Sequence, residues 1–459
     1  MSGILVIALA LGALIYLAYR GLSLLLLTPA LAVFAVLASD GGPMLASYTQ
    51  IFMQATGGFI VQFFPLFLLG AVFGKLMDAS GAAQVLADGI IHGLGAGRAI
   101  LSVILSCALM TYGGVSLFVV AFAVWPIAAH LFREADLPKR LIPATIALGA
   151  FTFTMTALPG TPAIQNAIPM PYFGTTPFAA PGLGVLTGLV MLSLGWLWLE
   201  RRARVLGPGY GDAEEDVAQV SDADQPGLIV AGTPLALVLL LNLAFTFVII
   251  PQLDTSYLDQ SLYGDTDIEA VRGVWSIIAA LTLSSLALIA LNRARLRKRL
   301  AQALDSGAKD SLLPIFNTAS LVGFGAVIAS LSGFALIRDW VVVAGGDNPL
   351  ISLAIGTSLL AGMTGSASGG MSIALSTLGE TYLEMGLAAG ISPELLHRVT
   401  AVATGGLDAL PHNGAVITLL TICGLTHREA YRDIAVVAVV IPLIALVVLI
   451  TLGTIFGSF

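Results

Sequence analysis

The sequence predicts an all-α polytopic membrane protein with about ten transmembrane crossings and two re-entrant hairpins. Three observations predict this fold class: the composition, the lengths of the apolar runs, and the placement of Lys and Arg. Of the 459 residues, 57% are hydrophobic and 10% are charged, and the mean hydropathy is +0.95. Because a soluble globular protein carries about 25% charged residues, we expect the surface of this chain to face lipid.

The composition and motif content also argue against several classes of function. The basic residues form no cluster with interleaved aromatic side chains, so nucleic acid is not an expected partner. Cys107 and Cys423 lie far apart in apolar runs and match no zinc spacing, so we expect no metal and no cofactor. The chain contains no G-x-S-x-G, H-E-x-x-H or Walker-type motif, so neither an enzyme nor an ATP-driven pump is predicted.

Eight apolar runs are continuous candidates for crossing a bilayer, which takes about 20 apolar residues per helix. They are residues 4–19, 22–38, 58–76, 182–200, 231–251, 272–292, 314–337 and 433–452. No basic segment precedes the first run, so we interpret it as a retained span and not as a cleaved signal peptide.

Four further apolar stretches are interrupted by small and polar residues. They are 99–132, 141–176, 349–378 and 394–425, with interruptions at 111–114, 158–162, 365–370 and 405–414. Irregular backbone at membrane depth is tolerated only where protein or a wet cavity surrounds it, because lipid cannot satisfy N–H and C=O groups. The four breaks therefore predict a polar site inside the helix bundle.

The distribution of Lys and Arg predicts the orientation. If 99–132 and 349–378 enter and leave on the same side, and 141–176 and 394–425 each cross once, one side holds 17 of the 20 basic residues. Basic loops are typical of the cytoplasmic side. We therefore expect a multi-pass protein of the bacterial inner membrane with both termini outside.

The chain divides into two halves around a linker. The first half, 1–204, contains the hairpin 99–132 and the broken helix 141–176, and the second half, 229–459, contains 349–378 and 394–425 in the same order. The halves begin on opposite sides of the membrane, so they form an inverted repeat. The linker, 205–228, is acidic and Gly-rich and is expected to be a cytoplasmic tether. Inverted repeats with discontinuous helices are typical of secondary transporters.

Helix breaks inside a membrane predict an anion site. A half-helix offers unpaired N–H groups and the positive end of its dipole, which bind carboxylates. We expect half-helices to begin after the breaks at Gly160 and Gly414, and the hairpin tips at Gly113-Gly114 and Gly369-Gly370 to add backbone donors. The alternative is that these small residues are helix-packing contacts.

Hydroxyl and amide side chains near the breaks are expected to recognise hydroxyl groups of the substrate. They are Thr111, Tyr112, Ser116, Thr161, Gln165, Asn166, Ser366, Ser368 and Asn413. The sequence therefore predicts a site for a small hydroxylated organic anion.

Asp408 and His412 are the candidates for proton coupling. An intramembrane carboxylate is costly and is by default functional, and a histidine titrates near physiological pH unaided. Alternatively, Asp408 caps the following half-helix or binds sodium. Arg398, near the outer end of the same segment, has two open interpretations: it steers an incoming anion, or it extends to the membrane interface.

Four stretches also resemble a known family. They are "FFPLFLLGAVFGKLMDASGAA" (63–83), "TYGGVSLFVVAFAVWPIA" (111–128), "LPKRLIPATIALGAFTFTMTALPGTPAIQNAIPMPYFGT" (137–175) and "GGLDALPHNGAVITLLTICGLTHREAY" (405–431). They resemble the gluconate permease (GntP) family of the ion-transporter superfamily, and most of all its hydroxybutyrate-permease branch. The resemblance covers nearly the whole chain except the linker 205–228. It implies a homodimer, a scaffold with a moving transport domain, and proton symport of small hydroxy-carboxylates.

Taken together, the residues and the resemblance predict a proton-coupled symporter that takes up 3-hydroxybutyrate, gluconate or a similar anion by elevator-like alternating access. Two alternatives stay open: a sodium-coupled transporter of citrate or dicarboxylates, and an anion channel or uniporter.

Overall fold

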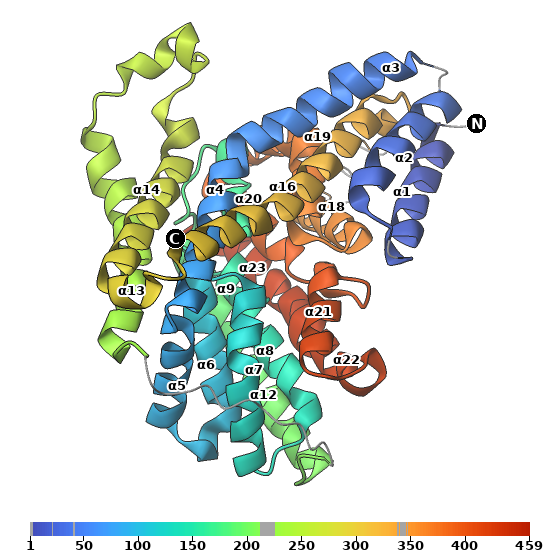
Figure 1. The fold of residues 1–459 in the computed structure, drawn as a ribbon. Helices are drawn as coiled ribbons and strands as arrows, with labels where there is room; N and C mark the ends of the chain where they lie inside the picture. The colour runs from blue at the N-terminus through green and yellow to red at the C-terminus, as the bar shows by residue number, and fades with distance from the viewer. Residues whose placement is uncertain are drawn as a thin grey trace.

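The computed structural model describes residues 3–20, 22–39, 42–211, 225–336 and 348–459, together with Asp339 and Gly346. Most of the predicted linker, 212–224, lies outside these residues, as does Arg338. The described residues form helices joined by turns and loops, with no strand among them (Figure 1). The predicted all-α class is therefore confirmed.

Within the described ranges, seven helical segments are long and apolar enough to cross a membrane. They are Met44–Ala79, which ends in α4 (Met53–Ala79); α7 (Leu117–Glu134); α12 (Pro181–Leu206); Leu228–Gln252, which begins with α13 (Leu228–Ala244); α14 (Ile268–Leu291); α16 (Leu300–Ser330); and His427–Phe456, which joins α22 (His427–Ala435) to α23 (Ile441–Phe456). Shorter apolar helices include α1 (Gly3–Tyr19), α2 (Leu24–Ala38), α5 (Ala82–Leu94), α6 (Ala99–Tyr112) and α18 (Pro349–Thr364).

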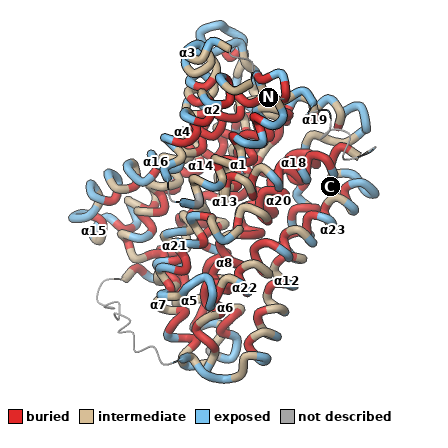
Figure 2. The backbone as a smooth tube through the Cα atoms, turned by 90° about the vertical axis from the view of Figure 1, so that its right-hand side faces the viewer, coloured by how far each residue is buried: buried red, intermediate tan, exposed pale blue. Residues whose placement is uncertain are grey.

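The outer surface of the bundle is apolar. Figure 2 shows buried residues along the inner sides of the helices and exposed residues on their outer sides. Large hydrophobic side chains such as Leu26, Val61 and Ile229 are among the most exposed. A water-soluble fold does not leave so much contiguous apolar surface uncovered, so this surface is the one that lipid covers.

The helices α4 and α16 form a tightly packed pair (Figure 1). Glycines bring their backbones together: a Cβ at Gly307 would lie 2.7 Å from the Cα of Val72, and one at Gly323 would lie 2.3 Å from Oγ1 of Thr56. Such contacts leave no room for any larger side chain and are typical of membrane helix pairs. We therefore treat α4 and α16 as one rigid unit.

Two pairs of helices form hairpins with short tips. The helices α6 and α7 are joined by residues 113–116, and α18 is joined to α19 (Ala367–Ala388) by Gly365 and Ser366. Gly114 has a φ of +94° and Gly365 a φ of +61°, a left-handed conformation that glycine adopts without steric cost. Oγ of Ser366 accepts a 3.1 Å hydrogen bond from the N–H of Gly369 and caps α19.

The segment 394–425 breaks in the middle. It contains α20 (Pro393–Thr404), a single 3₁₀ turn at Leu407–Ala409, and α21 (Gly414–Ile422). Gly414 thus begins a half-helix, as the sequence predicts.

The segment 141–176 breaks differently. It contains α8 (Ile142–Ala150) followed by three four-residue helices: α9 (Phe153–Thr156), α10 (Ile164–Ala167) and α11 (Met170–Phe173). The prediction that a half-helix begins after Gly160 is therefore wrong. Pro159, Pro162, Pro169 and Pro171 lack the N–H that a helix needs, so the hydrogen-bond ladder is repeatedly interrupted.

One helix lies outside the spans predicted from the sequence. Residues 82–94 form α5, which packs against α6 and α13. At 13 residues it is too short to cross a bilayer, and so the search for runs of about 20 apolar residues does not detect it.

Candidate functional site

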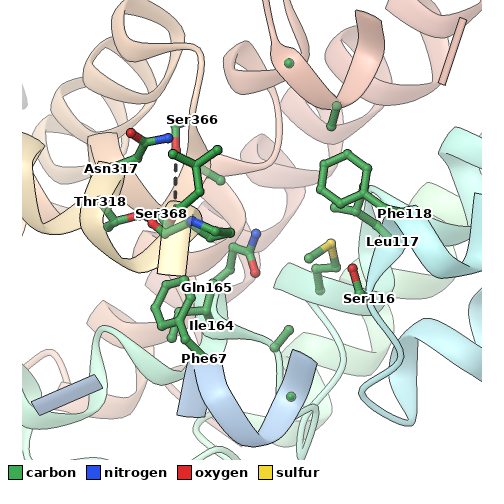
Figure 3. A pocket seen from close by; sticks show the side chains of 18 of the residues that line it. Phe67, Ser116, Leu117, Phe118, Ile164, Gln165, Asn317, Thr318, Ser366 and Ser368 are labelled. Carbon is green, nitrogen blue, oxygen red and sulfur yellow. Dashed lines mark hydrogen bonds between the residues drawn. The ribbon is translucent and has the colours of Figure 1, made fainter. Parts of the chain in front are cut away.

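A cavity of about 980 Å³ lies where the interrupted segments meet. Its walls come from α4, from α16, from the tips of both hairpins, from residues 151–165, and from residues 408–417. All four interruptions therefore converge on one hollow, part of which is seen in Figure 3.

Most of the residues predicted for the site line this cavity. They are Thr111, Gly114, Ser116, Gln165, Ser366, Ser368, Asp408, His412, Asn413 and Gly414. The other predicted residues do not line it: Tyr112, Gly113, Gly160, Thr161, Asn166, Gly369 and Gly370. The structure gives each of these seven a packing or hydrogen-bonding role.

Tyr112 and Gly113 hold the first hairpin tip in place. Oη of Tyr112 donates a 2.6 Å hydrogen bond to the carbonyl oxygen of Pro159. A Cβ at Gly113 would lie 2.3 Å from Cδ2 of Leu235, so this glycine packs against α13. The tip therefore faces the cavity through Gly114 and Ser116 instead.

Gly369 and Gly370 lie within the first turns of α19 and not at the hairpin tip. A Cβ at Gly370 would lie 2.2 Å from the backbone nitrogen of Ala361, and one at Gly369 would lie 2.4 Å from Cδ1 of Leu321. These glycines let α19 approach α18 and α16 closely. Helix packing, the alternative that the sequence left open, accounts for this pair.

Arg398 closes the break in 141–176 and has neither of its predicted roles. Its side chain is completely buried. Nη1 donates to the carbonyl oxygen of Thr156 at 3.1 Å and to Oδ1 of Asn166 at 3.0 Å, while Nε and Nη2 donate to the carbonyl oxygen of Ala179 at 3.1 and 2.7 Å. An arginine on α20 therefore supplies the donors that this irregular backbone needs.

Two asparagines complete the closure. Nδ2 of Asn166 donates to the carbonyl oxygens of Thr161 at 3.0 Å and Pro177 at 2.9 Å. Nδ2 of Asn242, on α13, donates to the carbonyl oxygen of Gly160 at 3.0 Å. Gly160, Thr161 and Asn166 are thus part of a structural clasp, which accounts for their absence from the cavity wall.

His397 belongs to the same clasp. It is completely buried, with Nδ1 2.6 Å from Oγ1 of Thr175 and Nε2 3.3 Å from Oδ1 of Asn166. His397 is not predicted as a site residue, because a histidine near the predicted end of a span is typical of the membrane interface.

The broken segment 394–425 also contributes to the cavity wall. Nδ2 of Asn413 donates to the carbonyl oxygen of Gly365 at 2.9 Å, which ties the start of α21 to the second hairpin tip. Oδ1 of Asn413 caps α21 by accepting from the N–H groups of Ala415 at 2.6 Å and Val416 at 3.1 Å. Gly414 has open space where a Cβ would stand, so this end of α21 is accessible from the cavity.

Asp408 and His412 lie on the cavity wall between α20 and α21. Asp408 belongs to the 3₁₀ turn Leu407–Ala409 and is partly buried. His412 packs against Gly365, since a Cβ at that glycine would lie 2.8 Å from Cδ2 of the imidazole. No ion pair to Asp408 is found within the described ranges.

Figure 3 shows a polar group on one side of the cavity, formed by Asn317, Thr318, Ser366 and Ser368. On the other side it shows Leu117 and Phe118 next to Ser116. Within the polar group the hydroxyls are linked: Ser368 Oγ lies 3.3 Å from Oγ1 of Thr318 and 3.4 Å from Oγ of Ser366.

Three buried oxygen atoms of the cavity have no hydrogen-bond partner in the part of the chain that the structure describes. They are Oγ1 of Thr111, Oε1 of Gln165 and Oδ1 of Asn317. A buried polar atom left unpaired costs about 1–3 kcal/mol, so these atoms indicate that a hydrogen-bonding molecule or water occupies the cavity.

Asn317 is not among the residues that the sequence predicts for the site. It lies on α16, a helix that contains none of the four interruptions. The available signal was an amide within an otherwise apolar run, and an intramembrane polar residue is itself an indication of function.

Comparison with known proteins identifies relatives. No protein-family model matches the chain. The uncharacterized transporter YxjC of Bacillus subtilis is 44% identical over 454 residues, which cover 95% of this chain and 96% of the relative. An uncharacterized transporter of Haemophilus influenzae is 25% identical over 377 residues, which cover 77% of this chain and 81% of the relative.

A solved structure has a similar fold. The YdaH transporter of Alcanivorax borkumensis, whose crystal structure is described as revealing an unusual topology, superposes with a TM-score of 0.56 and 16% sequence identity. The superposition covers 92% of this chain and 90% of that chain. At this identity the likeness shows the fold alone, which is that of a multi-pass membrane protein.

Proposed function

The chain belongs to the family of membrane transporters that includes YxjC of Bacillus subtilis, and from this premise we propose that it is a proton-coupled symporter of a small hydroxy-carboxylate. It is a transport protein and not an enzyme, as the sequence predicts. The similarity of residues 63–83, 111–128, 137–175 and 405–431 to the gluconate permease (GntP) family supports the substrate class, with 3-hydroxybutyrate and gluconate as the first candidates.

One observation carries the proposal: the interrupted segments converge on a cavity that contains unpaired polar oxygens. The amides of Gln165 and Asn317 and the hydroxyl of Thr111 present both donors and acceptors. A substrate with hydroxyl and carboxylate groups satisfies such side chains from the cavity side. The apolar wall at Leu117 and Phe118 receives its carbon chain (Figure 3).

The substrate carboxylate binds at the start of α21. Gly414 leaves this helix end open toward the cavity, and the positive end of the helix dipole favours an anion there. Asn413 caps the helix and links it to Gly365, so this anion site keeps its shape as the hairpin tip moves.

Asp408 carries the coupled proton, assisted by His412. Both line the same cavity as the substrate groups, so a proton and an anion occupy one compartment. Protonation of Asp408 removes a negative charge from the neighbourhood of the bound carboxylate, which couples the binding of the two ions.

Alternating access follows from a division into a rigid part and a mobile part. The α4–α16 pair is the rigid scaffold, because its close glycine contacts prevent the two helices from shifting relative to each other. The two hairpins and the segments 141–176 and 394–425 form the transport domain, which carries its own part of the cavity wall past α4 and α16 in an elevator-like motion.

Uptake into proteoliposomes tests the proposal. Radiolabelled 3-hydroxybutyrate, gluconate and citrate are supplied separately, each with an imposed pH gradient, with a sodium gradient, and with neither. We expect a hydroxy-monocarboxylate to accumulate when the pH gradient is present. Accumulation driven by sodium alone would favour the sodium-coupled alternative, uptake that only equilibrates would indicate a channel or uniporter, and the absence of saturable uptake of all three anions would contradict the proposal.

A further inference from the structure

An ion pair stands at the rim of the cavity. Nζ of Lys75, on α4, lies 2.8 Å from Oδ2 of Asp310, on α16, and both residues line the cavity. The Lys75 side chain is 31% exposed and the Asp310 side chain 52% exposed. The pair is therefore open to solvent and within reach of a solute that enters or leaves.

The cavity has few other cations. Among the described residues that line it, the only lysines or arginines are Lys75 and Lys309. Lys309 is paired along its own helix, with Nζ 2.7 Å from Oδ2 of Asp305. Lys75 differs because its partner lies on another helix and on the cavity wall.

Two parallel strips of residues connect the rim to the interior of the cavity. On α4 the strip runs from Lys75 through Gly70 to Phe67, and on α16 it runs from Asp310 to Asn317. At about 1.5 Å of rise per residue, each strip covers about 10–12 Å. The unpaired amide oxygen of Asn317 and the ion pair are thus the two polar ends of one passage.

The helices that carry the ion pair are held rigidly close to it. Gly307, three residues before Asp310, packs against the backbone of Val72, three residues before Lys75. The position of the ammonium group is therefore set by backbone packing and does not depend on the ion pair alone.

We propose that Lys75 is a carboxylate-binding residue at the cytoplasmic mouth of the cavity, where the substrate anion replaces Asp310 as the partner of the ammonium group. This inference rests on the proposed transport of an organic anion. An exposed ion pair contributes little net stability, so another carboxylate can exchange with it readily. Asp310 in turn competes for Lys75, which prevents the anion from being trapped at the mouth.

The side of the membrane follows from the chain. Lys75 and Lys309 lie toward the ends of α4 and α16 that adjoin the segments 75–98, with two basic residues, and 293–309, with six. These segments are the predicted cytoplasmic ones. Lys75 therefore acts on substrate that binds from, or leaves to, the cytoplasm.

Side-specific kinetics test the inference. Right-side-out membrane vesicles containing the wild-type protein or Lys75→Gln are assayed for influx and for efflux of the transported hydroxy acid. We expect Lys75→Gln to raise the KM for efflux roughly five- to tenfold, as expected for the loss of one charge-assisted contact, and to leave the KM for influx unchanged. The difference between the two proteins should shrink as ionic strength rises, because salt screens an exposed charge.

Three variants serve as controls. Lys309→Gln removes the same charge from the same cavity and should leave both KM values unchanged. Asp310→Asn frees Lys75 and should keep the efflux KM equal to or below that of the wild type. Lys75→Arg keeps the positive charge and should restore most of the efflux affinity.

The outcomes separate the two proposals. An unchanged efflux KM in Lys75→Gln, or an increase of the same size in Asp310→Asn, would show that the ion pair only joins the helices, and would overturn the inference. A wild-type protein that carries no hydroxy acid would instead contradict the proposed function, and this inference with it.

Discussion

The two broken segments, 141–176 and 394–425, share a Leu-Pro step but differ in the groups that satisfy their interrupted backbone. Each contains a Leu-Pro step with a glycine and a small polar residue among the next three residues, and neither is helical at that step. In the first, Arg398, Asn166 and Asn242 donate to the carbonyl oxygens of Thr156, Thr161 and Gly160, so buried side chains satisfy the break even though residues 162–165 line the cavity. In the second, the break opens onto the cavity.

The comparison teaches that an interruption in a membrane helix is not by itself a binding site. The backbone groups freed by a break need partners, and the partners come either from the protein or from a solute. Where a buried arginine supplies them, the break provides a rigid support. In the second break, Asn413 caps α21, and Tyr431 and His427 bond to the carbonyl oxygens of Ala409 and Pro411, while Gly414 lines the cavity.

Removing the Arg398 guanidinium from the first break should have the largest effect, which is a loss of stability. Arg398→Met should reduce or abolish the folded protein, because the carbonyl oxygens of Thr156 and Ala179 and Oδ1 of Asn166 lose their donors at about 1–3 kcal/mol each. Thermal unfolding of the detergent-solubilised variant measures this. Arg398→Lys is the matched control, and a single ammonium group should recover only part of the stability. A variant Arg398→Met that is as stable as the wild type would remove the structural role assigned to the first break.

Replacing the carboxylate of Asp408 by a neutral amide should abolish proton coupling without unfolding the protein. Asp408→Asn keeps the shape of the side chain but cannot release a proton, so we expect no accumulation driven by a pH gradient. Exchange of labelled for unlabelled substrate, which needs no net proton movement, should continue. Uptake against a gradient by Asp408→Asn at the wild-type level would exclude Asp408 as the proton carrier.

Removing the amide of Asn317 should weaken substrate binding selectively. We expect Asn317→Ala to raise the KM about tenfold, the effect of losing about 1.4 kcal/mol of hydrogen bonding, with an unchanged unfolding temperature. Thr318→Ala is the control on the same helix, since Oγ1 of Thr318 already donates to the carbonyl oxygen of Pro314. Equal KM values in Asn317→Ala and the wild type would place the substrate elsewhere in the cavity.

Two glycine substitutions should give the smallest effect, a difference in unfolding temperature between the two variants. Gly370→Ala places a methyl group against the backbone of α18 and should lower the unfolding temperature, whereas Gly414→Ala enters open space and should leave it unchanged. Measured side by side, the pair distinguishes a packing glycine from one that faces the cavity. Similar unfolding temperatures for the two variants would contradict the close approach of α18 and α19.

The candidate site was only partly predictable from the sequence. Ser366, Ser368, Asp408 and Asn413 were found because polar residues in an apolar run are visible without any coordinates. Asn317 was missed because the continuous span around it shows no interruption. Tyr112, Gly160, Thr161 and Asn166 were included for their position next to a break, although their hydrogen bonds turn away from the cavity.

The sequence by itself determined that this chain is a polytopic helical membrane protein and where its helices are interrupted, because both properties depend on local composition and on the cost of exposing polar groups to lipid. Only the tertiary structure decided which interruption has its carbonyl groups satisfied by a buried arginine. That outcome depends on Arg398, which reaches the first break from a helix more than 200 residues away in the chain, and no local pattern reports such a contact.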